Sequence, residues 1–80
     1  MEMEPIPIQQ QFEEVIASDN LLEVKDFINN QNISDVANLI YENPDYEIQI
    51  ISTLSIHRAA SVFKILDLME QKRIIKKLPA

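Results

Sequence analysis

The chain has 80 residues, which allows one domain at most and only a thin hydrophobic core. It contains no cysteine and no glycine, so disulfides and thiolate metal sites are excluded, and tight β-hairpins and glycine-rich phosphate loops are poorly supported. Its formal net charge of −6 argues against nucleic acids and anionic membranes as partners.

The charge is divided unevenly along the chain. Residues 1–55 carry eleven carboxylates and one base, for a net charge of −10, whereas residues 56–80 carry two carboxylates and six bases, for a net charge of +4. Ordinary solvated helix faces give rise to such distributions. The more specific interpretation is an acidic surface that binds or responds to cations. The sequence leaves both interpretations open.

Residues 1–7 are acidic and contain Pro5 and Pro7, which interrupt any helix, so we expect a flexible tail and not a signal peptide. No apolar run approaches the roughly 20 residues that a membrane-spanning helix needs. The composition therefore predicts a soluble domain with a cytoplasmic location.

From Ile8 onward, apolar residues recur at helical spacing and polar clusters interrupt them at short intervals. The pattern predicts a first helix over residues 8–17, a second that ends near residue 30, and a third. Asp19 or Asn20 is expected to cap the second helix and Ser34 the third. The residues predicted to be buried in these helices are Phe12, Val15, Ile16, Leu21, Leu22, Val24, Phe27, Ile28, Val36, Leu39 and Ile40.

Asn43-Pro44 predicts the start of a fourth helix, because proline at the first helical position loses no hydrogen bond. Ser55 is expected to cap a fifth helix, and Asp67 with Glu70 has the capping-box spacing that opens a sixth, which Pro79 ends. Short amphipathic helices cannot each bury an apolar stripe alone. The predicted fold of residues 8–80 is therefore all-α, with about six short helices stacked into a superhelix.

Two segments of this helical pattern are similar to the cytosolic N-terminal domain of MgtE-type magnesium transporters. The first is residues 34–40, with Asp35-x-Ala37, and the second is residues 56–67, with Arg58-Ala59-Ala60-x-Val62. A closing Leu78-Pro79 follows, and the resemblance covers roughly residues 12–79.

The resemblance implies a right-handed superhelix that continues into further helices, CBS domains and a transmembrane domain, in a full-length homodimer. It also implies a Mg²⁺-sensing role on the cytoplasmic side of the cell membrane, in which the domain docks on the CBS domain when Mg²⁺ screens acidic surfaces, and the pore then shuts. Ser61 stands where the family has a metal-binding glutamate, and a neutral hydroxyl is a weak Mg²⁺ ligand.

The best local candidates for a weak, water-mediated Mg²⁺ site are Glu42, Asp45 and Glu47, which cluster around the turn at Pro44. Mg²⁺ keeps several of its waters and needs only one or two carboxylates. The alternative is that Asp45 and Glu47 occupy the first turn of a helix, where the helix dipole favours acidic residues without any metal.

The chain offers little for catalysis, so we expect a binding module and not an enzyme. His57 is the single histidine, and it has no partner pattern that would make it catalytic or metal-binding. The basic run over residues 72–77 is too short, and too poor in aromatic residues, to predict nucleic-acid binding. A protein-interaction scaffold, similar to the short-helix domains of flagellar motor switch proteins, is the alternative to the transporter domain.

Overall fold

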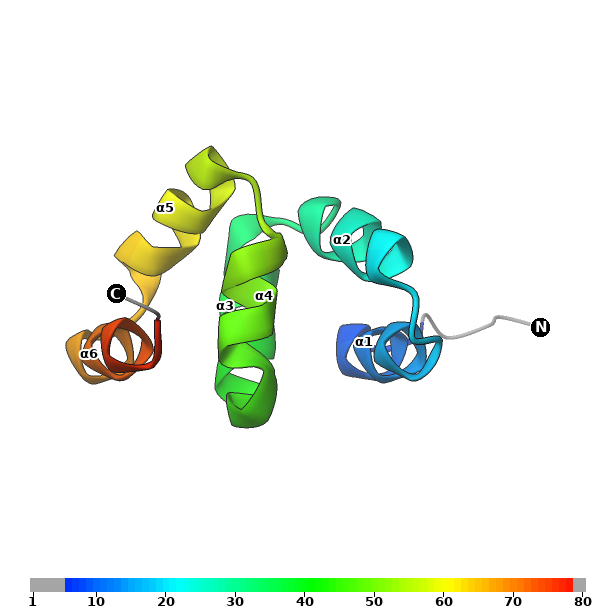
Figure 1. The fold of residues 1–80 in the computed structure, drawn as a ribbon, viewed down its shortest axis with the longest axis horizontal. Helices are drawn as coiled ribbons and strands as arrows, with labels where there is room; N and C mark the ends of the chain where they lie inside the picture. The colour runs from blue at the N-terminus through cyan, green and yellow to red at the C-terminus, as the bar shows by residue number, and fades with distance from the viewer. Residues whose placement is uncertain (1–5, 79–80) are drawn as a thin grey trace.

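A computed structural model describes residues 6–78, and over this range the chain is all-helical, with six α-helices, one short 3₁₀ turn and no strand (Figure 1). The elements are α1 (Ile8–Ala17), α2 (Leu21–Asn29), α3 (Ile33–Glu42), η1 (Pro44–Tyr46), α4 (Glu47–Thr53), α5 (Ile56–Ile65) and α6 (Leu68–Lys77). The predicted all-α fold of about six short helices is confirmed. Most of the predicted tail, and the predicted stop at Pro79, lie outside the described residues.

Two of the predicted helix caps are confirmed. The Asn20 side chain accepts a hydrogen bond from the Leu22 amide at 3.0 Å, at the start of α2. Asp19 has φ 55°, in the left-handed region, where a short polar side chain is tolerated, and it turns the chain between α1 and α2 in the absence of glycine. At α6, the Asp67 carboxylate accepts from the Glu70 amide at 2.8 Å.

The cap predicted for α3 is wrong. The helix begins two residues earlier than expected, at Ile33, and the Asn32 side chain caps it by accepting from the Asp35 amide at 2.9 Å. The hydroxyl of Ser34 instead donates to the Asn32 side chain at 2.9 Å. Ser55 does occupy the position before α5, but its side chain makes no capping hydrogen bond.

The helices contact neighbours one or two places along the chain, as expected for a stack of short helices. α1 packs on α2 and α3, α2 on α4, α3 on α4 and α5, and α4 on α6. These contacts form one row of odd-numbered helices and one row of even-numbered helices. Figure 1 shows α3 and α4 at the centre, with α1 and α2 at one end and α5 and α6 at the other.

The core is continuous and is richest on the central helix α3, where the predicted stripe of Val36, Leu39 and Ile40 is fully buried. The buried apolar residues are Phe12, Val24, Ile28, Val36, Ala37, Leu39, Ile40, Ile50, Leu54, Val62, Leu66 and Ile74. Leu21 and Leu22 were expected in this core but are 71% and 78% exposed. The reason is that α2 turns Val24 and Ile28 toward its neighbours and leaves its first turn uncovered.

Polar side chains join helices that are not adjacent in the chain. Gln9 of α1 and Asn43 after α3 exchange two side-chain hydrogen bonds of 2.8 Å. The Tyr41 hydroxyl accepts from the Asp67 amide at 2.8 Å, which ties the end of α3 to the start of α6. Within residues 6–78, no helix has the length and apolar content required to span a bilayer.

Candidate functional site

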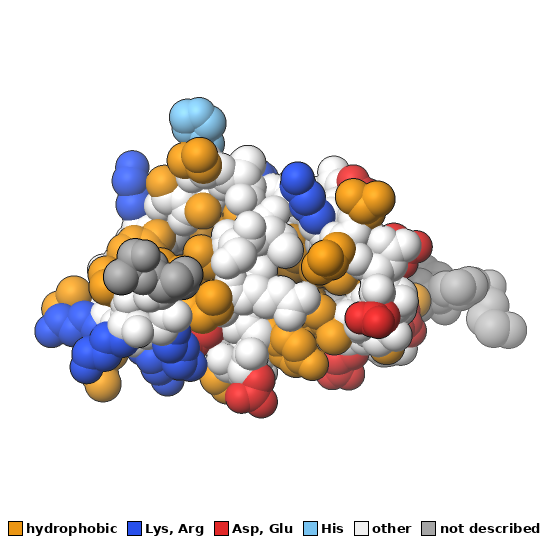
Figure 2. Space-filling model, viewed as in Figure 1, with side chains coloured by type: hydrophobic (Ala, Val, Ile, Leu, Met, Phe, Trp, Pro, Cys, Tyr) orange, Lys and Arg blue, Asp and Glu red, His pale blue; other side chains and the backbone are white. Residues whose placement is uncertain are grey.

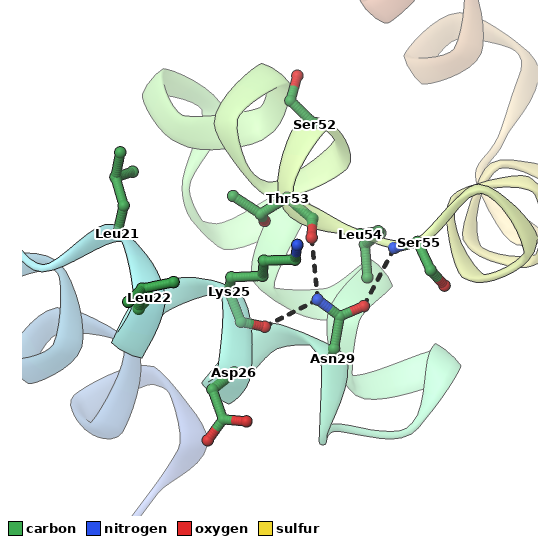
Figure 3. Close-up of a pocket in the computed structure, with 9 residues that line it drawn as sticks. All are labelled: Leu21, Leu22, Lys25, Asp26, Asn29, Ser52, Thr53, Leu54 and Ser55. Carbon is green, nitrogen blue, oxygen red and sulfur yellow. Dashed lines mark hydrogen bonds between the residues drawn. The ribbon is translucent and has the colours of Figure 1, made fainter.

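A groove of about 720 Å³ lies between α2 and the corner that joins α4 to α5 (Figure 3). Leu21, Leu22, Lys25 and Asp26 line the α2 side, and residues 52–55 line the other. Leu21 and Leu22 are 71% and 78% exposed, an unusual degree for two adjacent leucines. The groove therefore presents apolar side chains to solvent beside one acid and one base.

Asn29 fixes the floor of this groove. Its side-chain nitrogen donates to the carbonyl oxygens of Lys25 at 2.8 Å and Thr53 at 2.9 Å, and its oxygen accepts from the Ser55 amide at 3.1 Å (Figure 3). Backbone groups at the α4–α5 corner have no helical partner of their own, so one amide side chain satisfies both a donor and an acceptor there. Asn29 thereby fixes the α4–α5 corner to α2, and these two parts of the chain form the opposite walls of the groove.

A second cluster, which we call the buried charge cluster, consists of Glu47, Glu70, Arg73 and Lys77. Glu47 lies in the first turn of α4 and is 1% exposed, and its carboxylate accepts from the Lys77 ammonium at 2.6 Å and the Arg73 guanidinium at 3.4 Å. Arg73 also pairs with Glu70, which is 5% exposed. These ion pairs join α6 to α4. The two glutamates are buried, whereas the side chains of Arg73 and Lys77 are about half exposed.

The two carboxyl groups of the cluster titrate in opposite directions. Burial, a hydrogen bond with Glu47 and the charge of Glu47 raise the pKa of Glu70 to about 7, although Arg73 opposes the shift. Burial also raises the pKa of Glu47, but the hydrogen bonds from Glu70 and Lys77 and the charge of Arg73 outweigh it, so the pKa of Glu47 is lowered. One oxygen of Glu70 is buried without a hydrogen-bond partner among the described residues. Glu70 is therefore the member of the pair that keeps its proton to the higher pH.

The structure does not bring the three predicted metal ligands together. Glu42 lies exposed at the end of α3 and Asp45 lies exposed in η1, whereas Glu47 points into the buried charge cluster. Between residues 6 and 78, no group of three or more His, Cys, Asp or Glu side chains is placed to hold a metal ion. Within residues 6–78, therefore, Glu42, Asp45 and Glu47 do not converge on one site.

Two further positions discussed for the sequence, His57 and Ser61, lie on the surface. His57 and Ser61 are exposed on α5, and the Ser61 hydroxyl donates to the His57 carbonyl oxygen at 3.0 Å. A serine hydroxyl bonded to the preceding helical turn is a common local interaction. Ser61 therefore adds no acidic ligand at the position where the resemblance places a glutamate.

Sequence reasoning missed the buried charge cluster, although a signal was present. Glu70, Arg73 and Lys77 fall at positions i, i+3 and i+7, on the same side of α6 as the buried Ile74. Charges that share a face with a core residue point toward a buried partner. The partner, Glu47, lies far away in sequence and could be identified only once α4 and α6 were placed side by side.

Opposite charges gather at the two ends of the molecule. Figure 2 shows most of the visible Lys and Arg side chains at the α6 end, with a few more beside α5 and near α2, and Asp and Glu side chains at the lower centre and towards the α1–α2 end. Among residues 6–78, all the ion pairs belong to the buried charge cluster. The exposed carboxylates without an ion-pair partner in this range include Glu13, Glu14, Glu23, Asp26, Glu42 and Asp45.

Comparison of the chain with protein-family models, with curated proteins and with solved structures gives no significant match.

Proposed function

We propose that this chain is a regulatory docking domain, the cytosolic N-terminal module of an MgtE-type magnesium transporter. In this proposal it binds an adjacent CBS domain of the same polypeptide in a Mg²⁺-dependent way and thereby biases the transporter toward a closed state. The full-length protein would be a homodimer with this module on the cytoplasmic side of the membrane. The resemblance of residues 34–40 and 56–67 to that family motivates the proposal.

The observation that carries the docking role is the set of unpaired acidic side chains on the first half of a helical stack. Glu13 and Glu14 on α1, and Glu23 and Asp26 on α2, are exposed, and none of them forms an ion pair among the described residues. A surface of this kind repels another acidic surface until cations reduce the repulsion. Docking on an acidic neighbour would therefore depend on ion concentration.

Mg²⁺ enters this proposal only at an interface to which another domain contributes ligands. Residues 6–78 hold no metal-binding group of their own, and Ser61 supplies no carboxylate. A cation shared between two domains needs only one or two carboxylates from each side, because Mg²⁺ retains part of its water shell. Exposed carboxylates such as Glu42 and Asp45 suit such a role, whereas Glu47 does not, because Lys77 and Arg73 already neutralise it.

The test is limited proteolysis of the polypeptide that includes the proposed CBS domain. We expect the linker between the two domains to be cut more slowly as Mg²⁺ rises into the millimolar range, because docking covers it. Sodium chloride at the same ionic strength separates general screening from an effect of the divalent ion. Replacing Glu42 and Asp45 with Gln and Asn should reduce the protection. Replacing Glu13 and Glu14 with Gln, which lowers the acidic repulsion on α1 and removes no proposed ligand, should instead allow protection at a lower Mg²⁺ concentration.

Cleavage that proceeds at the same rate with and without Mg²⁺ would sink the proposal. The alternative, a protein-interaction scaffold similar to flagellar motor switch domains, is supported by the open groove beside Leu21 and Leu22. A scaffold would bind its partner equally well in the presence of a chelator. The dependence on the divalent ion therefore separates the two functions.

A further inference from the structure

The outward face of α6 combines cations with exposed apolar side chains. Leu68 and Met69 in its first turn are 63% and 83% exposed, and Lys72 and Lys76 follow on the surface one and two turns later. A shallow hollow of about 550 Å³ lies along this face, lined by Met69, Lys72 and Lys76 among others. The ammonium groups of Lys72 and Lys76 form no ion pair among the described residues.

The outward face of α2 shows the same order of features with mostly the opposite charge. Its first turn exposes Leu21 and Leu22, and the exposed carboxylates of Glu23 and Asp26 follow within the next turn. Lys25 is the single base of this helix. Both helices are thus apolar at their first turn and charged beyond it, and the sign is predominantly negative on α2 and positive on α6.

We propose that the outward face of α6 in one copy of the chain packs on the outward face of α2 in a second copy. Side by side in the same direction, the two helices would place Met69 against Leu22 and bring Lys72 and Lys76 to Glu23 and Asp26. Burial of exposed apolar area supplies attraction, and the opposite charges fix the alignment.

The occupant is a second copy because a single chain cannot make this contact. α2 and α6 lie in opposite halves of the stack, with the central pair α3 and α4 between them (Figure 1). The contact joins two different patches, so each copy can bind one partner through α6 and another through α2. The result is a short linear oligomer, unless two copies form both contacts with each other. This self-association is independent of the proposed transporter role.

The contact is small, which sets the conditions for observing it. Each of the two helices has about ten residues and is about 15 Å long. The area that two such helices can bury against each other lies at the lower end of the range for stable protein interfaces. We therefore expect a weak association that is seen by sedimentation velocity between about 10 µM and about 1 mM protein. The association should be stronger at about 0.02 M salt than at about 0.5 M, because the higher salt concentration screens the attraction between the lysines of α6 and the carboxylates of α2.

Two charge changes test the contact in opposite directions. Lys72→Glu with Lys76→Glu should weaken association about tenfold or more, because both cations of the α6 face are reversed. Lys25→Glu should tighten it about threefold or more, because it removes the base from the α2 face. General repulsion between negatively charged copies predicts the reverse for Lys25→Glu, so this variant separates a specific contact from net charge.

Lys64→Glu is the matched control, since it makes the same charge change at an exposed lysine of α5, and it should leave association unchanged or weaker. Met69→Ser should weaken association without a change in net charge. The proposal is overturned if the wild-type chain remains monomeric at about 1 mM in low salt. It is also overturned if Lys25→Glu leaves association unchanged or weakens it, or if the α6 double variant associates like the wild type.

Discussion

Replacing Glu70 with glutamine should change how the stability of the protein depends on pH. Glu70 is 5% exposed and faces Glu47, Arg73 and Asp67, and its pKa is raised from 4.5 to about 7. Between these two values the folded state holds a proton that the unfolded chain releases, so rising pH favours unfolding. The stability that Glu70 contributes is therefore complete below about pH 4.5 and is lost as the pH rises through about 7.

The magnitude follows from this pair of pKa values. Between pH 5 and pH 8, a single carboxyl group that shifts from 4.5 to about 7 lowers the free energy of unfolding by about 2.5 kcal/mol. This figure is an upper bound, because Glu47 shares the proton. Glu70→Gln keeps the shape and remains neutral, so the variant should lack this decline and be more stable than the wild type near pH 8. The lowered pKa of Glu47 acts below pH 4.5, outside the range of the assay.

The assay is urea unfolding followed by circular dichroism at several values between pH 5 and pH 8. Glu14→Gln is the control, because it removes an exposed carboxylate of α1 and should change stability by no more than about 0.5 kcal/mol. The quantity of interest is the stability difference between the wild type and Glu70→Gln at each pH. A difference that stays constant over this range would refute the assignment of the proton to Glu70.

Two further predictions concern local hydrogen bonds. Asn29→Ala should lower the free energy of unfolding by about 1–3 kcal/mol and speed amide exchange at Ser55, because that amide loses its acceptor. Asn30→Ala is the control, because it removes only side-chain contacts to Asp26 of α2. Equal exchange at Ser55 in both variants would contradict the role of Asn29. Asp67→Ala should cost about 0.5–2 kcal/mol in urea unfolding, whereas Ser55→Ala, which removes no cap hydrogen bond, should cost less, and the opposite order would contradict the assignment.

Local patterns in the sequence predicted the helices well because helix formation depends on neighbouring residues. The spacing of Val36, Leu39 and Ile40 predicted the central buried stripe, and Asn20 and Asp67 marked two helix starts. The start of α3 could not be decided in this way, because Asn32 and Ser34 are both good caps and lie two residues apart.

Burial at the surface of the stack could not be predicted, because it depends on which helices become neighbours. Leu21 continues the apolar pattern of α2, yet none of the elements between residues 6 and 78 packs over it. Glu47 has the sequence context of an ordinary first-turn acid, and its burial depends on Arg73 and Lys77 from α6. The candidate site thus differs from the prediction where tertiary contacts decide the role of a charged residue.

The arrangement of contacts also determines how the protein reaches its native state. Each helix touches mainly those one or two places away in sequence, so little loop closure is needed before native contacts form. Folding should accordingly be rapid and should begin around α3, which supplies four buried side chains and packs on helices on both sides. Of the described helices, α1 and α6 contact helices on one side only, so in the isolated 80-residue chain thermal fraying should start there and move inward.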